Sequence, residues 1–115
     1  MDLYEEITEK RKQLDYCIKE LRKNGSDFAA KERAYKVRMR AECLALREDG
    51  MPVTLIQQVV YGVEEVADLR YERDVAETTW RANIEAIQSL RLQLRILQQQ
   101  LNQEMSAPGV GYGDF

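Results

Sequence analysis

Residues 63–105 read VEEVADLRYERDVAETTWRANIEAIQSLRLQLRILQQQLNQEM and, within that stretch, contain neither glycine nor proline. Their apolar side chains recur at alternating spacings of three and four, which is the seam of a heptad coiled coil. Arg73 and Asn83 are the polar interruptions of this seam. The pattern predicts one long helix. Its seam consists of Val66, Leu69, Arg73, Ala76, Trp80, Asn83, Ile87, Leu90, Leu94, Leu97 and Leu101.

The length of this helix predicts self-association. A helix of about forty residues is about 60 Å long at a rise of 1.5 Å per residue. A compact domain of this size is only about 30–35 Å across. The helix must therefore kink or project towards a partner, and an exposed leucine seam favours a second copy. We expect a homo-oligomer with an interface formed by Trp80, Ile87, Leu90, Leu94, Leu97 and Leu101.

Two further helical blocks are expected in the first half of the chain, at about 2–23 and 26–48. Asn24-Gly25 is a plausible stop between them, because both residues tolerate the left-handed conformation. The second block carries two apolar stripes on nearly opposite sides, so we expect it to lie between neighbouring helices. The bulky stripe is Phe28, Tyr35, Met39 and Leu46, and the smaller one is Ala30, Ala34, Val37, Ala41 and Leu44.

A short apolar helix over 55–61 is expected to link the long blocks. Thr54 and Gln57 have capping-box spacing, Pro52 sets an extended entry, and Gly62 ends the helix. The fold class is therefore all-α: a long antiparallel helical hairpin, or three-helix arrangement, with a short linker helix and a long coiled-coil-like C-terminal helix. Residues 1–105 form one helical domain, and 106–115 form a flexible, Gly-rich tail in which Tyr112 and Phe115 are candidate docking anchors.

Composition limits the chemistry. The chain has 115 residues, 17 Lys+Arg, 20 Asp+Glu and no histidine, so it lacks the commonest general base and metal ligand. Cys17 and Cys43 lie on apolar stripes and are expected to be core residues in a reducing compartment. We expect no enzymatic activity, no metal and no cofactor. The acidic N-terminus has no signal-like apolar core and no run is long enough to cross a membrane, so we expect a cytoplasmic protein without membrane contact.

A basic cluster suggests an alternative function. Arg33, Lys36, Arg40 and Arg47 share one helical face, and Tyr35, Tyr61 or Tyr71 offers an aromatic surface for a base. Arginine forks bind phosphate well, so Arg33, Lys36 and Arg40 with Tyr35 are a candidate site for a small anionic, nucleotide-type ligand. The other interpretation is that the basic face pairs with the acidic start of the last helix, around Glu64.

Nucleic-acid binding is the weaker alternative. Residues 46–59 resemble the turn and following helix of a helix-turn-helix. The next helix, however, starts with Val63-Glu64-Glu65, which would repel phosphate, and the net charge is −3. Binding to nucleic acid is therefore unlikely on the sequence.

The stretch LREDGMPVTLIQQVVYGVEEVADLRYERDV (residues 46–75), with RLQLRILQQQL (91–101), resembles a family of small helical proteins encoded by tailed bacteriophages and prophages. The resemblance covers about residues 3–104 and excludes the tail. Its motifs mark the family and are not catalytic, so no functional residue is carried over. The resemblance implies a phage accessory protein in the host cytoplasm that inhibits or sequesters a host factor, such as a defence component, through protein–protein contacts.

Overall fold

The computed structural model describes residues 2–106. Within them all regular secondary structure is helical and there is no strand, which confirms the predicted all-α class. Residues 107–115, with the candidate anchors Tyr112 and Phe115, lie outside the described part. The elements are α1 (Leu3–Glu48), α2 (Val53–Val59), a single 3-10 turn η1 (Val60–Gly62) and α3 (Glu64–Met105).

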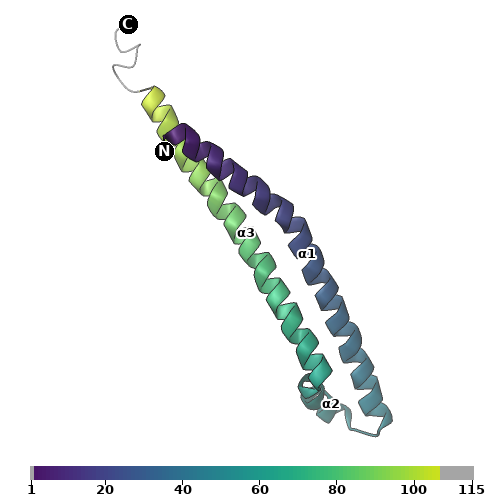
Figure 1. The fold of residues 1–115 in the computed structure, drawn as a ribbon. Helices are drawn as coiled ribbons and strands as arrows, with labels where there is room; N and C mark the ends of the chain where they lie inside the picture. Colours follow the sequence, from purple (N-terminus) through teal and green to yellow (C-terminus); the bar gives the residue numbers. More distant parts are fainter. Residues whose placement is uncertain (1, 107–115) are drawn as a thin grey trace, which may run out of the picture. The chain divides into compact units, whose positions relative to one another are not determined.

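The chain divides into two compact units, each built around segments of α1 and α3 (Figure 1). Unit 1 contains the described residues 2–21 and 83–106, and unit 2 contains 22–82. Within each unit the two segments run antiparallel. In unit 1, Cys17 meets Asn83 while Ile7 and Leu101 line the same groove. In unit 2, Phe28 meets Trp80 while Arg38 meets Glu65. The helical hairpin expected from the sequence is therefore present.

The predicted stop at Asn24-Gly25 is wrong, because α1 continues through both residues without a break. Gly25 is not among the residues with positive φ. It serves a close approach instead: a Cβ added there would lie 3.1 Å from Nε1 of Trp80. The indole also stacks on Phe28, with ring centroids 5.5 Å apart. Gly25 is thus the slot in α1 that receives Trp80.

A sequence signal for this continuity exists. Ile7, Leu14, Leu21, Phe28 and Tyr35 are spaced by seven, so the heptad register crosses Asn24-Gly25 unchanged. If the helix ended at these two residues, the apolar residues that follow would not need to keep the same seven-residue spacing. The unbroken seven-residue spacing is therefore stronger information than the local preference of Asn and Gly.

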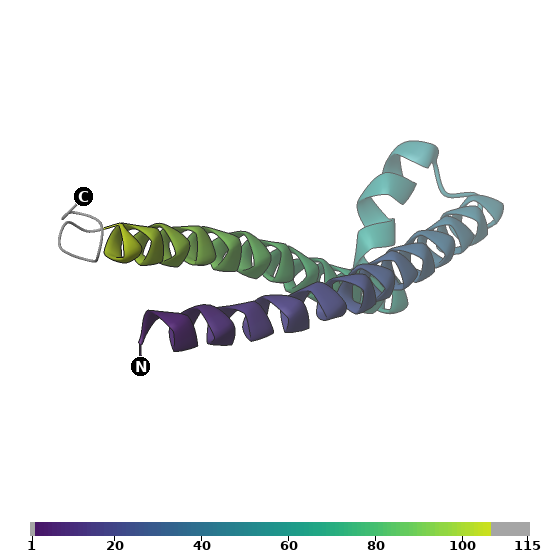
Figure 2. The same ribbon diagram turned by 90° about the horizontal axis from the view of Figure 1, so that it is seen from above.

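The turn after α1 follows the expected chemistry. Gly50 has a φ of 89°, and the amide of Met51 donates to the carbonyl of Leu46 at 3.1 Å, which closes the end of the helix. α2 then begins after Pro52, which is its N-cap without a side-chain hydrogen bond. The predicted capping box of Thr54 and Gln57 is therefore wrong, since Thr54 already lies inside the helix. Figure 2 shows α2 and η1 connecting the end of α1 to the start of α3.

Each unit has a small core. In unit 2, Tyr35, Val60 and Val66 form a buried cluster against which half-buried residues of α1 and α3 pack. In unit 1, the buried apolar residues are Ile7, Ile87 and Leu90. No helix between residues 2 and 106 is long and apolar enough to cross a membrane.

Among residues 2–106, the second apolar stripe of α1 does not lie between neighbouring helices, contrary to expectation. Val37 is 56% exposed and Leu44 is 54% exposed. Ala30 and Ala41 are exposed as well. The physical reason is that unit 2 supplies only one long neighbour, α3, and the bulky stripe of α1 already faces it.

Gly25→Leu should lower the free energy of unfolding by about 2–3 kcal/mol, because the added side chain overlaps the position of the indole. Trp80 is the only tryptophan, so its fluorescence should shift to the red as it is displaced into water. Chemical denaturation followed by tryptophan emission measures both effects. Ser26→Leu, at the next and exposed position, is the control and should leave the emission maximum unchanged.

Candidate functional site

The heptad seam of α3 faces α1 of the same chain. In unit 2, Trp80 is half-buried against Gly25 and Phe28. In unit 1, Ile87 and Leu90 are 5% and 8% exposed. The remaining members of the predicted interface, Leu94, Leu97 and Leu101, are half-buried. A contact between copies through these six residues stays a prediction. Because the residues pack against α1 of the same chain, an exposed leucine seam is no longer an argument for that contact.

Asn83 is the polar residue of the seam in unit 1. It is 9% exposed, and its Nδ2 donates a hydrogen bond to the carbonyl oxygen of Cys17 at 2.9 Å. A buried amide without a hydrogen-bond partner would destabilise the helix pair. The bond to Cys17 therefore lets Asn83 lie inside the apolar seam of unit 1.

Arg73 is the polar residue of the seam in unit 2. Its guanidinium lies 4.7 Å from the ring centroid of Tyr35, and Nη1 lies 3.6 Å from Oε1 of Glu32 on α1. Nε and Nη2 lie 2.9 and 2.8 Å from Oδ1 of Asp74. Burial lowers the pKa of Arg73, but the hydrogen bond and charge of Asp74 outweigh it, so the pKa is raised above its ordinary value.

The candidate anion site is only partly assembled. Arg33, Lys36 and Arg40 are all exposed on α1, and Lys36 lies 3.7 Å from Glu32. Tyr35, by contrast, is 5% exposed and is covered by Arg73. Including Tyr35 in the site is therefore wrong, because two residues along a helix is a rotation of about 200° and the ring points into unit 2.

The alternative interpretation of the basic face, pairing with the start of the last helix, is found at one position. Nη2 of Arg38 lies 3.9 Å from Oε2 of Glu65 and also contacts Glu42. Arg33 and Arg40 form no ion pair with any residue from 2 to 106. The two exposed arginines are thus available to a ligand or partner.

Cys17 and Cys43 are half-buried free thiols. Among the described residues, no group of three or more cysteines and carboxylates is arranged to hold a metal ion. The same part of the chain contains no buried side-chain polar atom without a hydrogen-bond partner.

α2 presents an apolar surface that the sequence analysis did not identify as a site. Ile56 is 5% exposed and anchors the helix, whereas Leu55 and Val59, one turn apart, are 46% and 40% exposed. Tyr61 of η1 is 46% exposed, with Arg70 at 5.2 Å from its ring centroid. We call Leu55, Val59 and Tyr61 the α2 surface. The available signal was a wide apolar side on a seven-residue helix, formed by Val53, Leu55, Ile56 and Val59, because a single neighbour covers only part of so wide a side.

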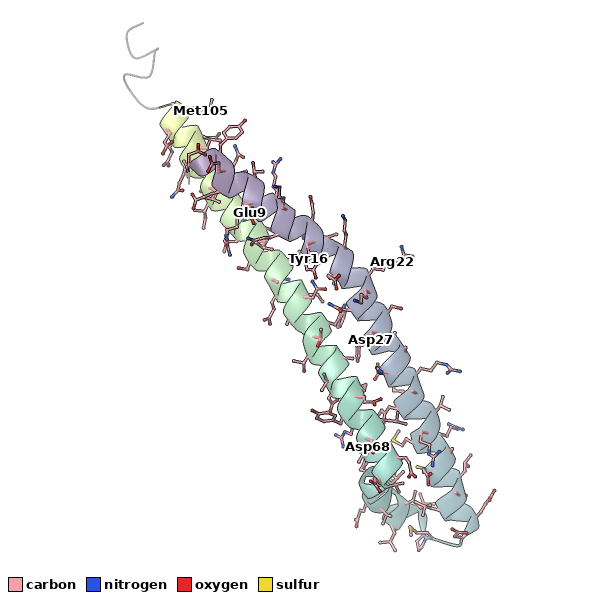
Figure 3. The ribbon with its side chains drawn as sticks, viewed as in Figure 1. Glu9, Tyr16, Arg22, Asp27, Asp68 and Met105 are labelled. Carbon is pink, nitrogen blue, oxygen red and sulfur yellow. The ribbon has the colours of Figure 1, made fainter. Side chains whose placement is uncertain are left out.

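Unit 1 has a groove along one side of its helix pair. It has a volume of about 560 Å³ and is lined mainly by apolar atoms. Tyr16, labelled in Figure 3, contributes from α1, while Ala86 and Ser89 contribute from α3. The groove is open to solvent and no ionisable cluster lines it, so it suits an apolar side chain better than a charged ligand.

Comparison with known proteins gives no match: no family model, curated protein or solved structure is similar to this chain at a significant level.

Arg73→Met should lower the free energy of unfolding by about 1–2 kcal/mol, because the guanidinium of α3 no longer contacts Tyr35 and Glu32 on α1. A raised arginine pKa contributes stability below the ordinary pKa that is lost only as the pH rises through the folded value. The guanidinium of Arg73 therefore stays charged from about pH 5 to 9, and its contribution to the free energy of unfolding is present throughout this range. Urea titrations of both proteins measure the difference. Arg81→Met, which removes an exposed ion pair with Glu77, is the matched control and should change stability by about 0.5 kcal/mol or less.

Proposed function

We propose that this chain is a non-enzymatic, phage-encoded accessory protein of the host cytoplasm that self-associates and binds a host protein through exposed helical surfaces. The phage origin rests on the resemblance of residues 46–75 and 91–101. The absence of histidine from the sequence supports a binding role over acid–base catalysis.

The observation that carries the proposal is the distribution of apolar side chains. Between residues 2 and 106, fourteen large hydrophobic residues are exposed, and two of them, Leu55 and Val59, lie one turn apart on α2. Exposed apolar side chains that lie side by side mark contact sites for other proteins, whereas isolated ones do not. The α2 surface is the best candidate, because Leu55 and Val59 project together from a helix that Ile56 holds in place.

Replacing Leu55 and Val59 by Ser tests this. The double variant should capture at least about fivefold less of the host protein than the wild type does, because two apolar contacts are lost. Tagged protein is incubated with bacterial lysate, and bound proteins are quantified by mass spectrometry. Gln57→Ser with Gln58→Ser is the control in the same helix, since both glutamines are exposed. Equal capture by all three proteins, or none by the wild type, contradicts the role of the α2 surface.

Sequestration of a small anionic ligand is the second candidate. The exposure of Arg33 and Arg40, without an ion pair to any described residue, favours it. Without Tyr35 the site would bind through charge alone, and such binding weakens as salt rises.

Native mass spectrometry of protein purified from infected cells separates the two candidates. A bound mass of a few hundred daltons that disappears in Arg33→Ala/Lys36→Ala/Arg40→Ala, with the oligomer mass unchanged, would support the anion site. Loss of the oligomer in that variant would show that these cations have a structural role.

A further inference from the structure

The groove along unit 1 is longer than the part described above. A second hollow of about 270 Å³ begins at Gln93, the residue where the first, of about 560 Å³, ends. The α3 residues along both include Ala86, Leu90, Gln93, Leu97 and Gln100, whose spacings alternate between four and three. This spacing keeps them on one side of the helix, so the two hollows are continuous.

The α1 wall leads to the same conclusion. Glu6 and Lys10 line the second hollow, and Gln13 and Cys17 line the first, at spacings of four, three and four. We call the whole hollow the unit 1 groove. Along α3 it covers residues 86–100, a length of about 21 Å at 1.5 Å per residue.

Apolar side chains of the unit 1 groove remain accessible to solvent. Ile96 of α3 is 47% exposed and Tyr16 of α1 is 65% exposed. Figure 3 labels Tyr16 and, at the end of α3, Met105. An apolar surface of this length is stabilised when other apolar groups cover it.

The chain beyond the described residues starts next to this groove. Its sequence, over 107–115, is APGVGYGDF. Met105 ends α3 less than two turns after Gln100, where the groove begins. Pro108-Gly109 has the composition of the central positions of a type II turn, which reverses the direction of a chain. At about 3.1 Å per residue in an extended chain, residues 110–115 then reach about 19 Å back along α3, to the level of Gln93.

We propose that residues 110–115 bind in the unit 1 groove of their own chain and run antiparallel to α3. Tyr112 then packs beside Ile96, and Phe115 packs near Gln93. An extended chain with three residues per turn presents these two aromatic rings on the same side, about 9 Å apart. Two turns of α3 cover about 11 Å, so one side of the groove accommodates both rings in succession.

Charge favours the same placement. Asp114 is the only side chain in residues 107–115 that is charged at neutral pH. Lys10 and Lys12 line the groove on the α1 side, together with one carboxylate, that of Glu6. The carboxylate of Asp114 therefore meets an excess of positive charge, and exposed pairs of this kind contribute more to specificity than to affinity.

The short connection to α3 favours this segment over a separate molecule. Only residues 106–109 separate the helix from the segment, and a short linker gives an effective concentration in the millimolar range. Another groove near the end of α3, lined by Gln98 and Leu101, has a volume of about 170 Å³ and covers one turn of that helix. It has room for one aromatic ring and not for two in succession.

Disulfide formation within one chain tests the placement. In a Cys17→Ala/Cys43→Ala background, Gln93→Cys is combined with Asp114→Cys in the full chain, which is then oxidised at low concentration. This pair should form an intramolecular disulfide at least about tenfold faster than the matched control, Arg91→Cys with Asp114→Cys. Arg91 is exposed at nearly the same level of α3 but lies about 200° around the helix from Gln93. Intact-mass spectrometry measures both rates.

The aromatic anchors are tested in the same chain with cysteines at 93 and 114. Tyr112→Ser/Phe115→Ser should lower the rate of disulfide formation about tenfold, because two apolar contacts with the groove are lost. Val110→Ser removes an apolar side chain of the same segment outside the two anchors. It is the matched control and should change the rate by about twofold or less.

Three results overturn the proposal. Equal rates for the Gln93 and Arg91 pairs would show that the segment does not select the groove. A rate that is unaffected by the loss of Tyr112 and Phe115 would show that these rings do not bind there. Faster disulfide formation between chains with one cysteine each, Gln93→Cys mixed with Asp114→Cys, would place the segment on another copy. The inference uses neither the α2 surface nor a host protein, so each is judged by its own assay.

Discussion

The register of unit 2 depends on Arg73, which lies in the apolar seam of α3 and contacts Tyr35 and Glu32 of α1. An apolar heptad seam is nearly identical to itself after a shift of seven residues, so leucines alone do not determine which turns of two helices meet. Contacts to particular side chains remove that degeneracy, because a shift of α1 by seven residues would take Tyr35 and Glu32 away from the guanidinium. In unit 1 the hydrogen bond from Asn83 to the main-chain carbonyl of Cys17 satisfies a buried amide, but it does not select a register, since every turn of α1 has an equivalent carbonyl.

With the register fixed, the size of side chains decides how closely the helices approach. Trp80, the largest residue of the seam, meets Gly25, where α1 has no side chain. The helix tolerates this glycine at a cost of about 1 kcal/mol relative to alanine. The stacking of Trp80 on Phe28 contributes an amount of the same order. Gly25 is thus explained by packing, although in isolation it suggests a break.

The two units bury few side chains completely, and this has a functional consequence. Among residues 2–106, each segment of α1 packs mainly on one segment of α3, so apolar residues on its other sides remain at the surface. In unit 2 these are residues of α2, such as Leu55, and the stripe of α1 that contains Val37. The charged side chains of Arg33 and Arg40 are exposed because they lie on the side of α1 away from α3, whereas Tyr35 faces α3. Surfaces of this kind suit contacts with other helices.

The sequence by itself determined the helical class, the extent of α3 and the seam that α3 buries, because a repeat of three and four over forty residues fits only one periodicity. It also determined that Gly50 and Pro52 separate the long helices, since their backbone preferences are local. Only the tertiary structure decided that α1 runs through Gly25, because the indole that fills the slot comes from a residue 55 positions away. It likewise decided that the leucine seam faces the same chain and that Tyr35 is covered by Arg73, since a stripe on a helix does not specify which neighbour covers it.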